Sequence, residues 1–303
     1  EFFASLPPCT VAMEACGGAH HWGREIAKLG HEIKLIAPKY VKPFVKRQKN
    51  DAADAEAICE AACRPTMRFV AVKSETTQAS GLVFRTRDIL VRQRTQITNA
   101  VRGHLAEYGL VGPQGAGHFK KLVAHLEDPA SSLPDEVRST LSLLAQTATG
   151  LEEKISLLDK EIIRRTREDE VARRLMTIPG IGPITATAIA ALAPPASAFR
   201  RGRDFAAWVG LTPLQKSTGG KQKLGAISRM GERTIRRLLI IGAAAAIHHA
   251  VRRGFPPTTW LGRMLARKPR MLVTVAQANK TARIVWALLA KGEDYKAPEV
   301  AAA

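Results

Sequence analysis

The sequence predicts an α/β region at the amino-terminal end, followed by long helices and an all-α carboxyl-terminal region. Strand-like and helix-like segments alternate over residues 1–72. Apolar residues then recur at helical intervals over residues 73–170. The remainder, residues 171–303, is basic and rich in alanine, again with helical spacing. Because each pattern is typical of a different layer architecture, we expect three parts with these boundaries.

The composition indicates a polyanionic partner. The chain has 303 residues, with 46 Lys and Arg against 27 Asp and Glu, and a net charge of +19. The positive electrostatic field of such a chain attracts nucleic acid or an anionic membrane surface. No apolar run reaches about 18 residues, so we expect no membrane span. No secretory signal is present and the four cysteines form no CxxC pair, so reduced thiols in the cytosol are expected.

The first 72 residues alternate between the two element types. We expect two strands, two helices and a basic segment between the second strand and the second helix: strands Val11–Ala15 and Glu32–Ala37, helices His20–Leu29 and one that begins near Asp51, and the basic segment Lys39–Lys49. Gly30 is a suitable residue to end the first helix, and Pro38 halts the second strand. Strands that alternate with helices predict a sheet with crossover connections.

Three carboxylates in this part are candidate metal ligands. Asp51 and Asp54 lie three residues apart, so a helix places both on one face. Magnesium is held by a few carboxylates together with water and phosphate oxygens. Glu14, at the end of the first strand, would supply a third ligand. The alternative interpretation, that Asp51 and Asp54 are simply favourable first-turn acids, stays open on spacing alone.

Two long helices are expected in residues 73–170. The first runs from about Thr76 to Tyr108 and is broken by Gly109. The second carries an apolar seam with alternating steps of four and three: Val137, Leu141, Leu144, Ala148, Leu151, Ile155, Leu158 and Ile162. Such a seam is typical of a coiled coil. An intramolecular hairpin of the two helices and a dimer contact both fit the pattern.

The last part has two features that favour nucleic acid. The stretch from Leu175 to Pro183 resembles the hairpin of a helix-hairpin-helix element, in which the N–H groups of Gly180 and Gly182 would hold a phosphate. A plain hairpin between helices is the alternative. Residues 233–292 contain twelve basic residues and no acid, which fits neutralisation of a phosphate backbone. A closing amphipathic helix is expected at Ala276–Leu289.

Within this part, Phe199–Ile241 places a hydroxyl in a glycine-rich, basic setting. Ser217 opens the run Ser-Thr-Gly-Gly-Lys, and ten Lys or Arg surround it against two acids. Glycines expose backbone N–H groups, and guanidinium forks suit phosphate oxygens. A hydroxyl held there would either bind a phosphate or attack one. Composition alone favours an ordinary turn.

Several motifs change that balance. The segments GRDFAAWVGLTP, STGGK and GAISRMGERTIR resemble, in this order, the carboxyl-terminal domain of the DEDD, Piv-like insertion-sequence transposases, the IS-one-ten family. That family is understood as bridge-RNA-guided serine recombinases. The resemblance implies that Ser217 is the nucleophile. Two positions depart from the family pattern, because Arg229 replaces a lysine and Glu232 replaces Asn or Asp.

The amino-terminal part resembles the same family. The segments VAMEACGGAHHW and KNDAADAEAI are similar to those that carry the second, third and fourth acids of the DEDD tetrad. The resemblance therefore implies a RuvC-like (ribonuclease-H-like) domain in which Glu14, Asp51 and Asp54 bind Mg²⁺ or Mn²⁺. The sequence starts at Glu1 without a methionine, and no residue occupies the place of the first Asp. We expect the opening strands and that ligand to be missing.

The resemblance also implies a mechanism and partners. Ser217 would attack a DNA phosphodiester to form a phosphoserine, assisted by Mg²⁺ or Mn²⁺ at the acids. DNA, a bridge RNA and further copies of the chain, in a dimer or tetramer joined by the coiled coil, are the expected partners in the bacterial cytoplasm near the nucleoid. The residues expected to contact nucleic acid are Thr218, Gly219, Gly220, Lys221, Arg229, Arg236, Gly180 and Gly182.

Two other hypotheses fit parts of the sequence. A RuvC-like metal-dependent nuclease or junction resolvase, with Ser217 structural, predicts nicking that survives Ser217→Ala and fails with Asp51→Ala. A non-catalytic nucleic-acid-binding remnant of a transposase predicts salt-sensitive binding without cleavage.

Overall fold

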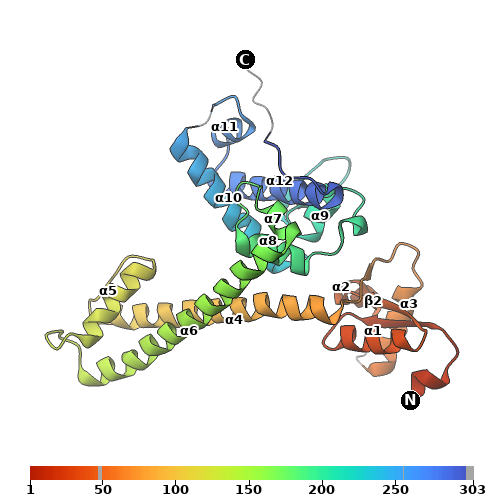
Figure 1. The fold of residues 1–303 in the computed structure, drawn as a ribbon, viewed down its shortest axis with the longest axis horizontal. Coiled ribbons are helices and arrows are strands. Elements are labelled where there is room, and N and C mark those ends of the chain that lie inside the picture. The colour runs from red at the N-terminus through yellow and green to blue at the C-terminus, as the bar shows by residue number, and fades with distance from the viewer. Residues whose placement is uncertain (47–49, 255, 298–303) are drawn as a thin grey trace. The chain divides into compact units, whose positions relative to one another are not determined.

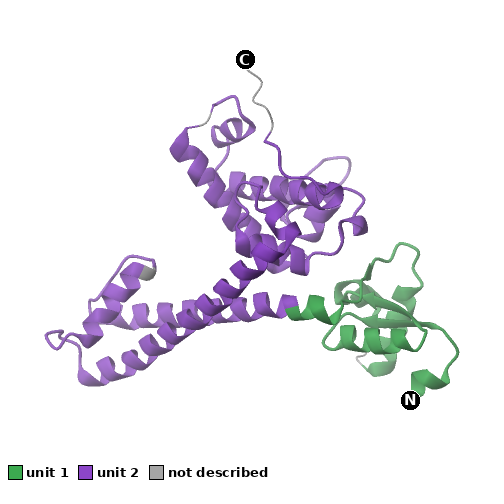
Figure 2. Ribbon diagram, in the orientation of Figure 1, with its two compact units in different colours: residues 1–79 green, residues 80–303 purple. Residues whose placement is uncertain are grey.

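The computed structural model describes residues 1–46, 50–254 and 256–297 (Figure 1). Two compact units divide the chain, Glu1–Ala79 and Ser80–Ala303 (Figure 2). The first is mixed α/β and the second is mainly helical, which confirms the expected order of the two classes. Residues 47–49 of the predicted basic segment lie outside the described residues.

The first unit is built on a three-stranded sheet of order β1-β2-β3, with strands β1 (Thr10–Glu14), β2 (Glu32–Ile36) and β3 (Phe69–Val70). Strands β1 and β2 are parallel, in register from Thr10↔Glu32 to Glu14↔Ile36, and helix α1 (Ala19–Lys28) connects them. The predicted crossover is therefore present. Strand β3 pairs antiparallel with β2.

Helix α3 (Asp51–Ala62) forms the core of this unit together with β2 and the short helices α2 (Pro38–Val41) and η2 (Lys42–Phe44). The short helix η1 (Phe2–Ser5) has no buried residue. The N-cap residue Asn50 begins α3, because its side-chain oxygen accepts the N–H of Ala53 at 2.8 Å. Ala57 and Ala61 are buried against Ile36. Their small side chains let α3 lie close to the sheet.

The two long helices pair within the chain. Helices α4 (Glu75–Glu107) and α6 (Asp135–Glu168) run antiparallel, with α5 (Ala116–Glu127) between them in the chain (Figure 1). Ion pairs Arg87–Asp159 and Arg94–Glu152 join them, so a step forward along α4 matches an equal step back along α6. The predicted seam of α6 is buried at Leu141, Ala148, Ile155 and Ile162. For these helices the structure shows the intramolecular hairpin.

The remaining elements form the largest hydrophobic core. They are α7 (Glu170–Leu175), α8 (Pro183–Leu192), η3 (Ala196–Ala198), α9 (Gly202–Trp208), β4 (Pro213–Gln215), β5 (Leu224–Ile227), α10 (Arg233–Arg253), α11 (Trp260–Leu265) and α12 (Arg270–Lys291). Phe205, Leu239 and Val285 are fully buried in this core. By length and composition, α10 is the one helix of the described residues that qualifies as a membrane span. One face of this helix, at Ile235, Leu239 and Ala243, packs in the hydrophobic core.

Two glycines let the turn after α7 approach α10. A Cβ atom added at Gly242 would lie 2.0 Å from the carbonyl oxygen of Gly180. One added at Gly180, where φ is 88°, would lie 2.5 Å from the carbonyl oxygen of Gly242. Both contacts are with backbone atoms, so neither residue can carry a side chain without separating the two segments.

This contact predicts opposite effects for two glycines inside helices. Gly242→Ala should lower the free energy of unfolding by at least about 2 kcal/mol, because the new methyl group overlaps a carbonyl. Gly150→Ala in α6, where nothing lies within 4 Å of the added Cβ, should raise it by up to about 1 kcal/mol through helix propensity. Urea denaturation followed by circular dichroism measures both. Stabilisation by Gly242→Ala would contradict the packing.

Candidate active site

Ser217 lies on a β-hairpin at the place where its turn begins. Strands β4 and β5 pair antiparallel, with Gln215 opposite Leu224. Beyond them, Thr218 and Lys221 exchange backbone hydrogen bonds of 3.0 and 3.3 Å. The two residues between them are Gly219 and Gly220, whose φ angles are 53° and 75°. Two positive φ values define a tight type I′ turn, so the hairpin itself requires both glycines.

Ser217 is exposed, and its hydroxyl accepts one backbone hydrogen bond. The backbone N–H of Lys223 donates to Ser217 Oγ at 3.2 Å. A hydroxyl that accepts one hydrogen bond keeps its proton and a second lone pair. The lysines at 216, 221 and 223 are all exposed. Within the described residues none of them forms an ion pair, so their charge is available to a phosphate beside the hydroxyl.

Close backbone packing anchors the base of the hairpin on the end of α9. A Cβ atom added at Gly231 would lie 1.7 Å from the carbonyl oxygen of Trp208, and one at Gly210 would lie 2.0 Å from that of Met230. Arg229 has a φ of 54°, the one positive value for a non-glycine among the described residues, and its N–H donates to Gly210 at 3.1 Å. The backbone at Trp208–Gly210 is therefore in direct contact with the backbone at Met230–Gly231.

Arg236 ties the same segments to α10. Its Nη1 donates to the carbonyl oxygens of Val209 and Met230 at 2.9 and 2.8 Å. Burial lowers the pKa of this guanidinium, and the nearby charge of Arg233 lowers it further. An arginine stays charged at neutral pH even so. The sequence predicted that Arg236 contacts a phosphate. In the structure its Nη1 is already used in hydrogen bonds to the backbone at the base of the hairpin.

The structure gives Glu232 a role. It is the N-cap residue of α10, and its Oε1 accepts the backbone N–H of Thr234 at 3.0 Å. Asn and Asp, which the resembled family carries at this place, are favourable N-cap residues for the same reason. The departure at Glu232 therefore keeps a capping oxygen at the start of the helix.

The two glycines of the helix-hairpin-helix resemblance differ in their surroundings. Gly180 packs against α10, as described above, which accounts for a glycine at that position. Gly182 is the N-cap of α8, is exposed and has no side-chain cap. Pro183 follows at the first helical position, where a missing N–H is tolerated. Gly182 is thus the member of the pair that lies at an open helix start.

The predicted metal ligands lie in the first unit, whereas Ser217 lies in the second. Glu14 ends β1 and is half-buried, while Asp51 and Asp54 lie in the first turn of α3, exposed and half-buried respectively. Helix α3 packs against β1. In the part of the chain that the structure describes, none of the three carboxylates forms an ion pair. Their oxygens are the ligand type that suits a hard divalent cation.

The three acids do not form a complete ligand group. Over residues 1–46, 50–254 and 256–297, no group of three or more His, Cys, Asp or Glu is placed to hold a metal ion. Magnesium is often bound by one or two carboxylates, with water and substrate phosphate in the other positions. The structure therefore does not bring Glu14, Asp51 and Asp54 together as a three-residue ligand group, and a site completed by a substrate phosphate stays a prediction.

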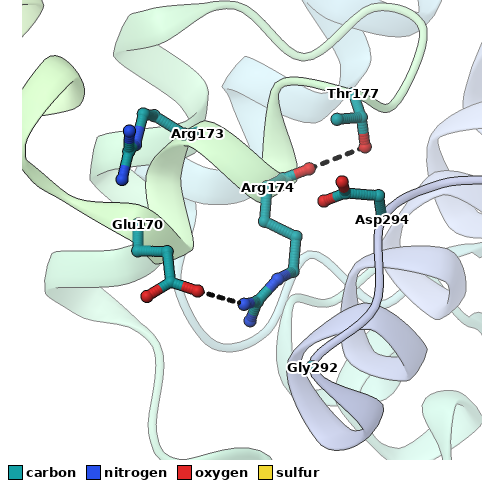
Figure 3. Close-up of a pocket in the computed structure, with 6 residues that line it drawn as sticks. All are labelled: Glu170, Arg173, Arg174, Thr177, Gly292 and Asp294. Carbon is teal, nitrogen blue, oxygen red and sulfur yellow. Dashed lines mark hydrogen bonds and ion pairs between the residues drawn. The ribbon is translucent and has the colours of Figure 1, made fainter.

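A cavity of about 350 Å³ lies elsewhere in the second unit, beside α7 and the end of α12 (Figure 3). Glu170, Arg173, Arg174, Thr177, Gly292 and Asp294 line it. Arg174 pairs with Glu170 at 2.7 Å, and the hydroxyl of Thr177 accepts the N–H of Tyr295 at 2.9 Å. No predicted site residue lines this cavity. Its polar groups hold the segment after α12 in place.

Two stretches of the chain match models of known protein families. Residues 172–255 match a family model described as "Transposase IS116/IS110/IS902 family", and residues 2–110 match a DEDD transposase model. Ser217 lies within the first match, and Glu14, Asp51 and Asp54 lie within the second.

Whole-length relatives are similar over nearly the entire chain. A Sinorhizobium fredii protein named as a transposase, y4pF/y4sB, is 45% identical over 99% of this chain and 77% of its own length. The transposase for insertion sequence element IS1328 of Yersinia enterocolitica is 42% identical over 96% of this chain and 87% of its own. That for IS1111A of Coxiella burnetii is 39% identical over 97% and 81%. The chain therefore belongs to the IS116/IS110/IS902 family of DEDD transposases.

Proposed function

We propose that this protein is the transposase of an insertion sequence, which cuts and rejoins DNA through a phosphoserine at Ser217. The observation that carries the proposal is the exposed Ser217 hydroxyl, oriented by the N–H of Lys223 and flanked by unpaired lysines. Membership of the transposase family supplies the substrate. The resemblance noted in the sequence supplies the nucleophile.

The chemical step follows from this arrangement. Ser217 Oγ forms a bond to phosphorus while the bond from phosphorus to the departing strand oxygen breaks. The hydroxyl proton passes to solvent, and the freed strand oxygen takes one up. A strand hydroxyl from the partner duplex then attacks the phosphoserine and restores the free serine. Each bond broken is replaced by one of the same kind, so no nucleotide hydrolysis is needed.

The lysines and the turn would act on the phosphate. Lys221 and Arg229 would neutralise its non-bridging oxygens, and the free nitrogens of Arg236 would add to this. Thr218, Gly219 and Gly220 present backbone and a hydroxyl next to Ser217. Gly182, and Gly180 beside it, would hold a second phosphate of the strand at the start of α8.

Glu14, Asp51 and Asp54 would hold a divalent cation, Mg²⁺ or Mn²⁺. When bound, such an ion stabilises developing negative charge on a phosphate and raises the acidity of an attacking hydroxyl. The parallel β1–β2 pair joined by α1, with α3 packed beside it, supports a RuvC-like fold for this part. Among the described residues these three carboxylates form no ion pair, which supports the assignment of a cation to them.

The remaining parts of the proposal concern assembly and targeting. The boundaries 1–72, 73–170 and 171–303 separate a metal-binding, a coiled-coil and a serine-bearing part. Exposed apolar residues on α6, such as Leu143 and Leu157, support contact with another copy, and thus a dimer or tetramer. A bridge RNA would determine the DNA site by base pairing with the target and donor DNA. Because its substrate would be chromosomal or element DNA, we expect the protein in the bacterial cytoplasm near the nucleoid.

Ser217→Ala should abolish a covalent protein–DNA species and reduce strand cleavage by roughly 10³-fold or more, because no other hydroxyl replaces the nucleophile. The matched control is Ser139→Ala on α6, which removes an exposed hydroxyl that donates to the carbonyl oxygen of Glu136 and should leave the adduct unchanged. Denaturing gels with labelled DNA from the element's ends, with its flanking RNA added, measure the adduct formed by the complete protein. Cleavage that survives Ser217→Ala would indicate a metal-dependent nuclease instead.

Asp51→Asn and Asp54→Asn should each reduce Mg²⁺-dependent cleavage by at least about 100-fold, since the carboxylate charge is lost while the shape is kept. Glu60→Gln on the same helix, which removes an exposed carboxylate paired with Arg64, is the control and should leave the rate unchanged. Rates over a Mg²⁺ and Mn²⁺ titration provide the measurement. Equal losses in all three variants would argue against a site at α3.

A further inference from the structure

Four arginines lie close to the start of α9: Arg200 and Arg201 precede the helix, Arg203 lies in its first turn, and Arg283 lies on α12. Arg200, Arg201 and Arg203 surround Gly202, and a Cβ atom added to Gly202 would lie 3.0 Å from the carbonyl oxygen of Arg283 on α12. The absence of a side chain at Gly202 therefore brings α9 against α12 at this point. All four arginines are exposed. We refer to them as the α9–α12 arginine patch.

Most arginines of the long helices are already neutralised. Seven of the eleven on α4, α6 and α7 form ion pairs with acids: Arg87 with Asp159, Arg92 with Asp88, Arg94 with Glu152, Arg138 with Asp135, Arg164 with Glu161 and Glu168, Arg165 with Glu161, and Arg174 with Glu170. These pairs leave little positive charge along the helical hairpin. They are surface pairs, so each contributes little to stability.

The α9–α12 arginine patch has almost no such compensation. Residues 171–292 contain only two acids, Asp204 and Glu232. Glu232 is used as the cap of α10, and Asp204 lies 3.6 Å from Arg201. Among the described residues, Arg200, Arg203 and Arg283 form no ion pair. Three unpaired guanidinium groups on adjoining elements repel one another unless an anion lies between them.

The position of the patch indicates which anion. The opposite end of α9, Trp208 to Gly210, anchors the hairpin that carries Ser217. A helix of seven residues is about 10 Å long. Double-stranded DNA carries one charge per about 1.7 Å of its axis, so a duplex that reaches Ser217 also presents phosphates a helix length away. Guanidinium forks bind such phosphates in a bidentate manner.

We propose that the α9–α12 arginine patch binds the phosphodiester backbone of duplex DNA beside the segment that reaches Ser217. The proposal rests on the proposed function for its ligand, DNA. It does not require the serine chemistry, because the patch lies at the other end of α9 and would contact only the phosphates of the DNA backbone. It therefore adds a positioning surface that fixes where along the duplex Ser217 acts.

The test compares two double variants with the same change in net charge. Arg203→Gln with Arg283→Gln removes two unpaired arginines of the patch. Arg94→Gln with Arg164→Gln removes two arginines of the same unit that are paired with acids. Binding of fluorescent duplex DNA to the complete protein is measured by anisotropy over a range of salt concentrations. Circular dichroism confirms that both variants are folded.

The patch variant should bind about tenfold more weakly, and the slope of log affinity against log salt should fall by about two. The control should keep both values, because its arginines are already neutralised within the chain. Equal losses in the two variants would show a general charge effect and overturn the patch. A loss seen only with duplex RNA would overturn the assignment to DNA.

Ser217→Ala separates this proposal from the proposed function. It should keep the binding affinity and the salt slope of the unmodified protein while it loses the covalent species. If the unmodified protein forms the adduct and the patch variant keeps its salt slope, the serine mechanism stands and the patch is wrong. If the patch variant loses its slope but no adduct forms with any variant, the patch stands and the phosphoserine is wrong.

Discussion

The contact between the backbone at Trp208–Gly210 and the backbone at Met230–Gly231 is the constraint on which the serine site depends. A two-stranded hairpin alone is only marginally stable in water, so it needs an anchor. Here the anchor is van der Waals contact between main chains, which any side chain at Gly210 or Gly231 would break. Arg236 reinforces it with two hydrogen bonds. The orientation of Ser217 therefore follows from the packing of α9 and α10 against each other's ends.

The sequence was sufficient to predict the long, periodic elements. Helices α1 and α4 and the parallel strands β1 and β2 were expected within one residue of their bounds, because amphipathic spacing and Gly or Pro punctuation mark them. For α3 the sequence predicted the start, and for α6 it predicted the apolar seam but not the ends. Strand β3 has two residues, and β4 and β5 have three and four, which is too short for a period to be visible. Helix α5 follows a Gly- and Pro-containing stretch that was interpreted only as a break.

For the candidate site, the sequence predicted the local features but not the long-range contacts. The motif around Ser217 identified the residue, and local turn chemistry would have identified the I′ turn from its two glycines. Long-range roles were invisible. The brace at Arg236 links carbonyls 27 and six residues away, and Gly180 owes its identity to Gly242, 62 positions further along the chain. No local spacing contains that information. The same limit applies to Glu14 and Asp51, whose neighbourhood depends on tertiary packing.

The placement of acids along the chain separates structural from functional charge. Where arginines hold helices together, as on α4 and α6, each has a carboxylate partner at helical or cross-helix spacing. From residue 171 to residue 292 only two carboxylates remain, and one of them caps a helix. A folded unit tolerates such uncompensated charge only at a cost in self-repulsion, which a bound polyanion relieves. The excess of positive charge is therefore concentrated in residues 171–292, the part of the chain that also contains Ser217.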